Sequence, residues 1–268
     1  MAATQLDERH HAVVRDLLLA DPVVNVFALG ILEQWGVAAV RGGRWLGAIQ
    51  SDGRLQAVGY AGPPDSNGRA SIAVAAGDAT ACEAIGCGMA RLGGAAWVIA
   101  ERPLAEALWR GLGSPARRVE SDQILMQAQR VSGGPKLPIR PAAESDLAWV
   151  LTAANAMLFE DLGIREPHVL SPTAAIEGEH IGVSDGRSVY RAKLATRCSV
   201  GAQIGGIWVP PEMRRQGICE AATRSLVAHL LGEHPRVTLH VRRDNPTAIE
   251  CYRRVGFVPE RAFKVLVR

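Results

Sequence analysis

One glycine and its basic neighbours form the segment whose spacing most clearly predicts chemistry. Pro210 and Pro211 end a β-rich run, because proline cannot donate to a sheet ladder, and Gly217 follows a short turn. Apolar residues recur at helical spacing directly behind Gly217 and predict a helix there. The first turn of a helix offers unpaired N–H groups and the positive end of its dipole, so the loop predicts a site for a phosphate or pyrophosphate.

Other interpretations of this loop stay open. An ordinary connection between a strand and a helix would have the same pattern. A Walker A loop is excluded, because no Gly-Lys-Ser/Thr follows, and Gly-x-Gly-x-x-Gly is absent as well. Cys219, at the predicted helix start, could have a lowered pKa. A nucleophilic role for Cys219 is the minor alternative, since no histidine stands near it in sequence.

The second segment surrounds a tyrosine about thirty residues later. Asn245 suits the N-cap of a helix, Pro246 suits its first position, and Gly256 suits its end. Tyr252 falls on the apolar face of this predicted helix. Taken alone, the segment predicts a well-capped helix with Tyr252 packed into the core.

Together, in this order and separation, the two segments resemble the GCN5-related N-acetyltransferase (GNAT) family. Arg214-Arg-Gln-Gly-Ile-Cys219 is similar to the family's Arg/Gln-x-x-Gly-x-Gly/Ala signature, and Asn245-x-x-Ala-x-x-x-Tyr252-x-x-x-Gly-Phe is similar to its second motif. The resemblance implies that loop amides hold the pyrophosphate of acetyl-CoA and that Tyr252 protonates the departing CoA thiolate. Cys219 replaces the family's Gly or Ala. Because the interaction uses a backbone N–H, we expect binding to survive.

The expected acetyl-CoA contacts come from the strand end, the loop and the second helix. They are Ile207, Trp208, Val209, Arg214, Arg215, Gln216, Gly217, Ile218, Cys219, Glu220, Asn245 and Tyr252. The arginines could meet CoA phosphates or could be surface charge. No metal is expected.

The acceptor side of the predicted reaction is less defined. The resemblance implies direct attack of a neutral amine on the thioester in a ternary complex, with backbone N–H groups near Val209 as oxyanion candidates. Glu160 is the candidate catalytic carboxylate. Glu160 and Asp161 attract an ammonium, act through water, or are a solvated pair. His240 is a structural histidine rather than a base on this interpretation, and Gln203 and Glu220 are weaker candidates.

These residues need strands and helices to position them, and the hydrophobic pattern predicts α/β, or mixed α+β, architecture with a mixed sheet. Before residue 132, helices are expected at about 6–20, 23–35, 78–93 and 103–112, and strands near 44–50, 54–61, 70–75, 95–100 and 117–128. After residue 136, helices are expected at about 144–158, within 166–179, and at 218–231 and 246–255, and strands at 137–140 and 237–241, with a final strand at the end. A hairpin at Ser184-Asp185-Gly186 leads into one long strand that ends at Val209.

The Ser-Gly-Gly-Pro-Lys stretch at 132–136 is the predicted linker between two domains. Residues 137–268 carry the resemblance and form the expected catalytic domain, whose central strands splay apart around the cofactor. Residues 1–131, with the run Arg102-Pro-Leu-Ala-Glu-Ala-Leu-Trp, resemble a domain that precedes the acetyltransferase domain in some actinobacterial family members. This half lacks the loop signature, so we expect tandem GNAT-like domains, each with a mostly antiparallel twisted sheet, of which the first is degenerate and cofactor-free.

Composition narrows the remaining classes of function. The formal net charge is only +3, so no nucleic-acid surface is predicted, and five cysteines without a framework spacing predict no disulfide scaffold. No signal peptide or membrane span is evident, which leads us to expect a cytoplasmic protein. A small-molecule or amino-acid-like amine is the expected acceptor, and homodimerisation stays open. The alternatives are a non-catalytic acyl-CoA-binding or regulatory protein, an interaction scaffold, or an enzyme that uses another acyl-CoA or a protein amine.

Overall fold

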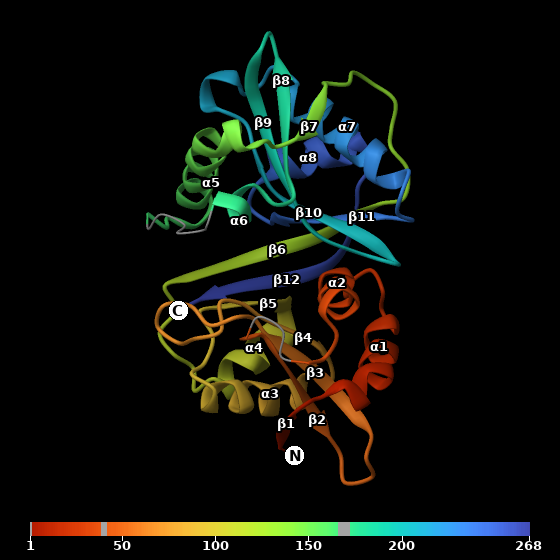
Figure 1. Cartoon of the computed structure of the whole chain (residues 1–268), viewed down its shortest axis with the longest axis vertical. Coiled ribbons are helices and arrows are strands. Elements are labelled where there is room, and N and C mark those ends of the chain that lie inside the picture. Colours follow the sequence, from red (N-terminus) through yellow and green to blue (C-terminus); the bar gives the residue numbers. More distant parts are fainter. Residues whose placement is uncertain (1, 39–41, 166–171) are drawn as a thin grey trace. The chain divides into compact units, whose positions relative to one another are not determined.

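The computed structural model describes residues 2–38, 42–165 and 172–268 (Figure 1). Contacts divide the chain into two compact units. Unit 1 contains Met1–Leu125, Arg242–Asp244 and Arg261–Arg268, and unit 2 contains Met126–Val241 and Asn245–Glu260. Unit 1 is therefore built from residues at both ends of the sequence. The domain limits at 132–136 stay a prediction.

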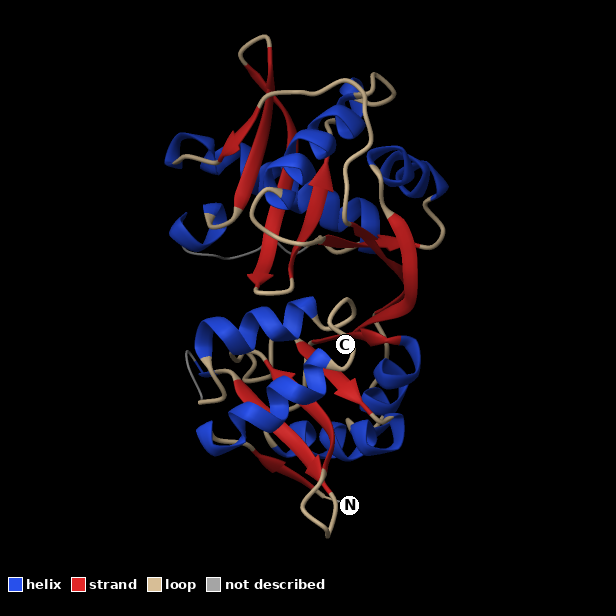
Figure 2. Cartoon of the chain, turned by 90° about the vertical axis from the view of Figure 1, so that its right-hand side faces the viewer, coloured by secondary structure: helices blue, strands red, loops and turns tan. Residues whose placement is uncertain are grey.

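Unit 1 is a mixed sheet with helices packed on it (Figures 1 and 2). Its strands are β1 (Ala3–Gln5), β2 (Arg44–Ile49), β3 (Leu55–Ala61), β4 (Ala73–Gly77) and β5 (Trp97–Glu101), and its helices are α1 (His11–Leu19), α2 (Val26–Trp35), α3 (Ala79–Arg91) and α4 (Arg102–Gly111). Strands β1 to β4 pair antiparallel in chain order, and β4 pairs parallel with β5 at Ala73 and Val98. Two long strands, β6 (Val119–Ala128) and β12 (Val258–Val267), contribute residues to both units.

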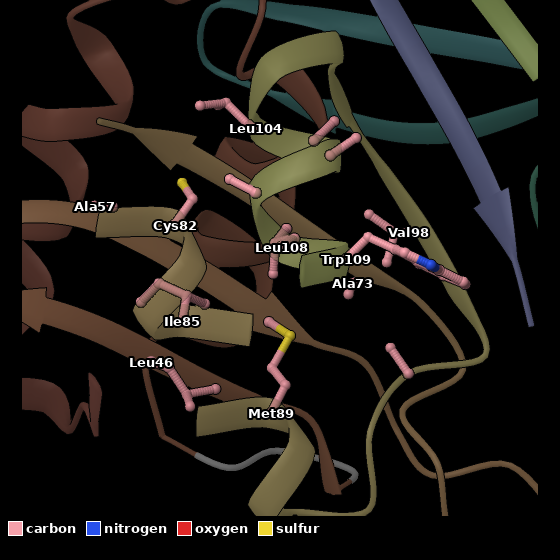
Figure 3. Packing of buried hydrophobic residues seen from close by; sticks show 14 of the residues in the cluster. Leu46, Ala57, Ala73, Cys82, Ile85, Met89, Val98, Leu104, Leu108 and Trp109 are labelled. Carbon is pink, nitrogen blue, oxygen red and sulfur yellow. The ribbon is translucent and has the colours of Figure 1, made fainter. Parts of the chain in front are cut away.

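The core of unit 1 lies between helices α3 and α4 and the sheet (Figure 3). Ile85 and Leu108 are completely buried there, and Leu266 of β12 joins the same cluster. The two helices touch through their backbones, because a Cβ added at Gly86 would lie 2.3 Å from the carbonyl oxygen of Leu108. This close approach explains why α3 is rich in alanine and glycine.

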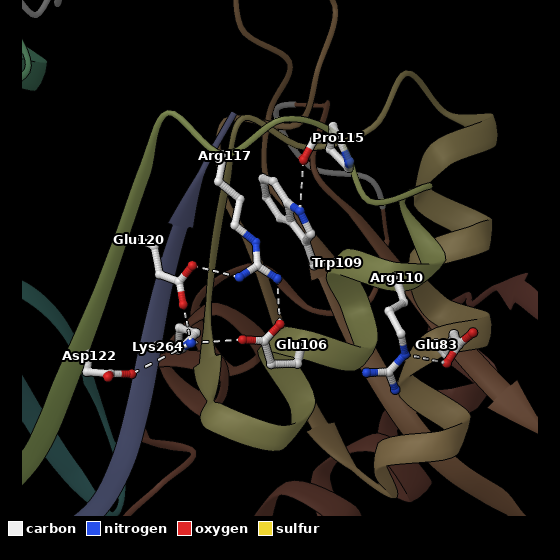
Figure 4. Close-up of polar contacts among 9 residues, drawn as sticks. All are labelled: Glu83, Glu106, Trp109, Arg110, Pro115, Arg117, Glu120, Asp122 and Lys264. Atoms are coloured by element: carbon white, nitrogen blue, oxygen red, sulfur yellow. Dashed lines mark hydrogen bonds and ion pairs between the residues drawn. The ribbon is translucent and has the colours of Figure 1, made fainter.

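Backbone hydrogen bonds and ion pairs hold the C-terminal strand, β12, against the rest of unit 1. Residues Phe263 to Val267 of β12 pair antiparallel with β5. Lys264, only 4% exposed at its side chain, contacts the carboxylates of Glu106 (2.8 Å), Glu120 and Asp122 (3.8 Å), and Arg117 bridges the first two (Figure 4). The hydrogen bond from Lys264 lowers the pKa of Glu120.

Unit 2 repeats the order of unit 1, with antiparallel strands followed by a parallel one. Its strands are β7 (Ile139–Pro141), β8 (Glu179–Ser184), β9 (Arg187–Cys198), β10 (Gly201–Trp208) and β11 (Val237–Arg242), and its helices are α5 (Leu147–Leu162), α6 (Pro172–Ile176), α7 (Ile218–Leu231) and α8 (Pro246–Val255). Residues 166–171 of the predicted helix within 166–179 lie outside the described residues. The hairpin at 184–186 is confirmed, with Asp185 and Gly186 both at positive φ.

The predicted single strand that ends at Val209 is wrong. Ser199 and Val200 form a tight turn, and the chain reverses there, so that β9 and β10 pair antiparallel. The sequence continues its β-rich pattern on both sides of this turn, and Ser199 and Gly201 are the weak turn signals there, so the pattern hides the reversal. Two strands, β9 and β10, therefore lie between β8 and the loop that follows Trp208, where one strand was predicted.

Strand β10 separates from its parallel neighbour, β11, towards its C-terminal end. It pairs with β11 only at Ala202, Gln203 and Ile204, and then continues to Trp208. This register agrees with the predicted splay of two central parallel strands. The end of β10 therefore has an edge that β11 does not cover.

The stretch predicted as a linker is held by a buried arginine. Arg224 of α7, whose side chain is 2% exposed, donates from Nε to the carbonyl of Ser132 (3.1 Å) and from Nη1 to the carbonyl of Pro135 (2.7 Å). Its Nη2 also bonds Glu220 at 2.6 Å. The segment thus follows a fixed path across unit 2.

Among the described residues, no helix has the length and apolar character needed to cross a bilayer.

Candidate functional site

The N-terminus of α7 is open to solvent. Gly217 is its N-cap, with φ of 76° in the left-handed region that favours glycine, and a Cβ added there would meet nothing within 4 Å. Glycine has no side chain that could accept from the N–H groups of the first turn. These donors, with the dipole behind them, remain directed at the space in front of the helix.

The equivalent connection in unit 1 is closed by a carboxylate. Asp78 is the N-cap of α3, and its Oδ1 accepts a hydrogen bond from the N–H of Ala81 at 2.9 Å. Both helices follow a strand that pairs parallel with the next strand, so the two helix starts are topologically matched. In unit 1 the negative charge of Asp78 occupies the place where an anion would bind.

Arg214 links the loop to helix α5. Its Nε donates to the carbonyl of Val209 at 3.0 Å, and its Nη2 donates to Glu160 Oε2 at 2.6 Å. Trp208 Nε1 donates to the other oxygen of Glu160 at 3.4 Å, and Trp149 packs edge-on against Trp208 at 6.2 Å. Glu160, predicted as catalytic, is therefore the counter-charge of a loop arginine. Its catalytic role stays a prediction.

The remaining loop residues are exposed. Arg215 adopts a φ of 63°, which is uncommon outside glycine and marks local strain in the loop. Gln216 is also exposed, and its side-chain amide donates to the carbonyl of Glu212 at 3.3 Å. Neither side chain is buried by the fold, so both are accessible to a ligand.

The first turn of α7 contains, next to Ile218, the thiol of Cys219 and the carboxylate of Glu220. The Cys219 sulfur accepts a hydrogen bond from the Cys251 thiol of α8, which lowers the pKa of Cys219. Glu220 bonds Arg224 and lies 3.7 Å from Arg254. Its negative charge is therefore balanced by two arginines near the N-terminus of the helix.

Helix α8 holds the predicted proton donor. Asn245 Oδ1 accepts from the N–H of Ala248 at 3.0 Å, Pro246 is the first residue, and Gly256 ends the helix at φ of 122°, so the predicted caps are confirmed. Tyr252 is buried, and its ring lies edge-on to Phe257 at 6.0 Å. Burial raises the pKa of Tyr252 well above its usual value, and the nearby Cys219 adds to the rise. The phenol therefore keeps its proton until a strong base forms beside it.

Of the weaker candidates, Asp161 lies close enough to Tyr252 to raise the pKa of the phenol through its charge. His240 on β11 is half-buried, and desolvation of its ring lowers its pKa to about 4, so it is neutral and only weakly basic at neutral pH. Gln203 lies in the paired part of β10. Among the described residues, no group of three or more His, Cys, Asp or Glu side chains is placed to hold a metal ion.

Sequence reasoning missed a charged pair under β10. Arg191 of β9 bonds both Glu179 of β8 and the carbonyl of Gly206. Nothing in the spacing of Glu179 and Arg191 indicates this contact. The adjacent Gly205 and Gly206 inside a strand are a signal that could have predicted an irregularity there.

One family model matches part of the chain. Residues 139–257 match the model of the acetyltransferase (GNAT) family. No curated protein matches the chain in sequence.

Solved structures match over nearly the whole chain. A GCN5-related N-acetyltransferase from Sphaerobacter thermophilus is 17% identical over 99% of this chain and 94% of that one, with a TM-score of 0.60. A GCN5-related N-acetyltransferase from Kribbella flavida is 21% identical over 90% of this chain and 95% of that one, with a TM-score of 0.55. A tandem GNAT protein from the clavulanic acid biosynthesis pathway is 15% identical over 99% and 97%, with a TM-score of 0.59. At these identities the likeness shows the fold, including its two-domain arrangement.

Proposed function

We propose that this chain, whose residues 139–257 match the model of the acetyltransferase (GNAT) family, transfers the acetyl group of acetyl-CoA to the primary amine of a small-molecule or amino-acid-like acceptor. The fold supports acyl-CoA-dependent N-acetyl transfer in general. The observation that carries the proposal is the open N-terminus of α7 at Gly217, beside the part of β10 that β11 leaves uncovered.

On this proposal, the N–H groups of the first turn of α7 bind the pyrophosphate, and Arg214 and Arg215 supply positive charge beside it. The contact between Arg214 and Glu160 would then compete with the phosphates for the same guanidinium. The uncovered edge of β10, from Ile207 to Val209, accepts the pantetheine arm by backbone hydrogen bonds. The thiol of Cys219 does not block this arrangement, because the loop binds through its amides.

Tyr252 would act as the general acid. A phenol whose pKa is raised by burial holds its proton in the resting state, and a thiolate forming beside it is a suitable base. The N–H groups at the end of β10 would stabilise the oxyanion during direct attack of the amine. Glu160 and Asp161, at the end of α5, would attract the ammonium form of the acceptor or remove its proton through water.

The acceptor proposal is supported by the surroundings of Glu160. Trp149 and Trp208 form an aromatic contact next to the carboxylate of Glu160, which suits a small cation by charge and by cation–π attraction. Unit 1 is proposed to bind no cofactor, because Asp78 caps the helix that would otherwise offer an anion site.

Two measurements test the proposed function. Calorimetry with acetyl-CoA should show binding, and a free-thiol assay across a panel of amines should show CoA release that depends on the amine. Binding without turnover for any amine would favour the alternative of a non-catalytic acyl-CoA-binding or regulatory protein. Faster turnover with longer acyl-CoAs, or with peptide lysines, would favour the alternatives of another acyl donor or a protein acceptor. Absence of acetyl-CoA binding would reject the proposal.

As a matched control, Asp78→Ala removes the N-cap of α3 in unit 1. It should lower the stability of the protein by about 1 kcal/mol and leave the affinity for acetyl-CoA unchanged, because the proposed site lies in unit 2.

A further inference from the structure

A buried pair of opposite charges lies on the face of the unit 2 sheet that α5 covers. Glu179 is 2% exposed and Arg191 is 5% exposed, and Arg191 Nη2 lies 2.6 Å from Glu179 Oε1. Arg191 Nη1 also approaches Met157 Sδ of α5 at 3.9 Å. The preceding residue, Tyr190, points to the opposite face, where its hydroxyl meets Thr223 of α7. The guanidinium of Arg191 therefore lies on the face of the sheet that α5 covers.

The second contact of Arg191 is with an irregular part of β10. Gly205 pairs with Lys193, and Trp208 pairs with Arg191, so three steps along β10 match two along β9. This is a β-bulge, which takes one residue out of the ladder and turns the strand. Gly206, inside the bulge, has a φ of 61°, and its carbonyl accepts from Arg191 Nη1 at 3.0 Å.

The position of Gly206 and the side chain of Arg191 depend on each other. A Cβ added at Gly206 would lie 2.8 Å from Arg191 Nη1, so the glycine leaves room for the guanidinium. Because a trans peptide is planar, its C=O and the next N–H point to opposite sides. Holding the Gly206 carbonyl therefore fixes the direction of the Ile207 N–H, which points away from Arg191.

Burying the charges of Glu179 and Arg191 costs a large desolvation free energy, so the pair is a poor means of stabilising a fold. Two buried charges lose hydration, and well-packed apolar residues of similar size often serve equally well. Glu179 Oε2 and Arg191 Nε have no hydrogen-bond partner among the described residues, and burial raises the pKa of Glu179. The contact that apolar residues could not replace is the one to the Gly206 carbonyl.

We propose that Arg191, held by Glu179, is a positioning residue that fixes the Gly206–Ile207 peptide, so that the N–H groups after the bulge face the thioester carbonyl. The inference rests on the proposed function, because it assigns these N–H groups a role in acyl transfer. It adds two residues, neither of which touches the substrate, to those on which the reaction depends.

The test replaces the pair without leaving an unbalanced charge. The double variant Glu179→Met with Arg191→Met keeps an apolar, filled site and removes the bond to Gly206. Arg191→Lys is the second variant, which keeps the charge opposite Glu179 but replaces two guanidinium nitrogens with one ammonium. Lys193→Met is the matched control, because Lys193 lies 3.8 Å from Glu179 and has no bond to Gly206.

Two readouts separate positioning from folding. We expect kcat to fall about 100-fold in the double variant, with the KM for acetyl-CoA within about twofold of the unmodified protein. Infrared difference spectra of bound acetyl-CoA labelled with ¹³C at the thioester carbonyl should show a stretch at lower frequency than in water, and the double variant should lose most of that shift. Arg191→Lys should be intermediate, and Lys193→Met should match the unmodified protein.

The possible outcomes separate the two proposals. A folded double variant with unchanged kcat and carbonyl frequency would overturn the positioning role while leaving acetyl transfer intact. If the double variant does not fold, unchanged values in Arg191→Lys would overturn it equally. A loss of kcat with an unchanged carbonyl frequency would also count against it. Failure of the unmodified protein to bind acetyl-CoA would remove the proposed function, and with it this inference.

Discussion

On the proposed mechanism, Tyr252 is a side chain of the core that also takes part in the reaction. Its ring packs against Phe257 as any buried aromatic would, and the same burial raises the pKa of its phenol. The protonated phenol is an inert core group in the resting protein. On the proposed mechanism, it donates its proton only when the CoA thiolate forms next to it.

For Tyr252→Phe we expect kcat to fall about 100-fold, because the general acid is lost, with little change in acetyl-CoA affinity. Steady-state kinetics and calorimetry would measure the two quantities. Tyr190→Phe is the matched control: it removes a buried hydroxyl that bonds Thr223 at 3.1 Å, and should lower stability while leaving kcat unchanged. Equal kcat values for Tyr252→Phe and the unmodified protein would remove the assigned role.

His240 predicts a pH dependence of stability. Its pKa is about 4 in the folded protein against 6.5 for an ordinary histidine, so folding favours the neutral ring. The corresponding stability is fully present above pH 6.5 and is lost as the pH falls towards 4. Over that range the loss should be about 3 kcal/mol. Urea unfolding at pH 7 and pH 4.5 should show a smaller drop for His240→Gln, and an equal drop in both proteins would contradict this assignment.

Contacts between side chains distant in sequence were the hardest to predict at this scale. Caps act over three residues, so Asn245 and Gly256 were predicted correctly from their immediate neighbours. Glu160 and Arg214 are 54 positions apart, and no local pattern indicates that they pair. The Glu179–Arg191 contact depends on the register of β8 and β9, which the sequence does not state.

At the scale of elements, prediction succeeded where a residue fixes the backbone. Helices α7 and α8 lie at the predicted 218–231 and 246–255, because Gly217, Pro246 and Gly256 mark their ends. The turn between β9 and β10 was missed, because Ser199 and Val200 suit a strand as well as a turn. The splay of β10 from β11 was expected from the resemblance rather than from local signals.

The strand β12 supplies a prediction at this scale. Lys264→Met leaves Glu106, Glu120 and Asp122 close together, with Arg117 as the remaining ion-pair partner of the first two among the described residues, so the free energy of unfolding should fall by about 2 kcal/mol at neutral pH. Because Lys264 and Arg117 lower the pKa of Glu106 and Glu120, the effect should persist through the ordinary glutamate range and shrink only at lower pH, as these two carboxylates become protonated. Arg110→Met is the control, since its pair with Glu83 is exposed and should contribute less than about 1 kcal/mol (Figure 4). Equal losses in the two variants would contradict a special role for Lys264.

At the scale of the whole molecule, the sequence indicated a tandem order of elements but not how units share strands. Residues 261–268 follow the Gly217 loop and the Tyr252 helix in sequence, yet they belong to unit 1. Local periodicity predicts a strand there, while its partner depends on the complete topology. Only pairing between β12 and β5 reveals which sheet the strand completes.

Leu266→Ala tests this sharing. Leu266 is fully buried in the core cluster of unit 1, so the truncation should cost roughly 2–5 kcal/mol. Hydrogen exchange measured by mass spectrometry should show faster exchange in α3 and α4, more than 150 positions earlier, with α7 and α8 little changed. Val227→Ala, in the buried face of α7, is the reciprocal control and should affect unit 2 instead. Faster exchange confined to α7 and α8 in Leu266→Ala would contradict the assignment of β12.

The sharing of strands also has a consequence for biosynthesis. Proteins commonly fold in the order in which the ribosome makes them, with the N-terminal domain first. Here the strand that lies against β5 is translated after every residue of unit 2. The edge of β5 that pairs with residues 263–267 therefore stays without this partner in the nascent chain until unit 2 has been made.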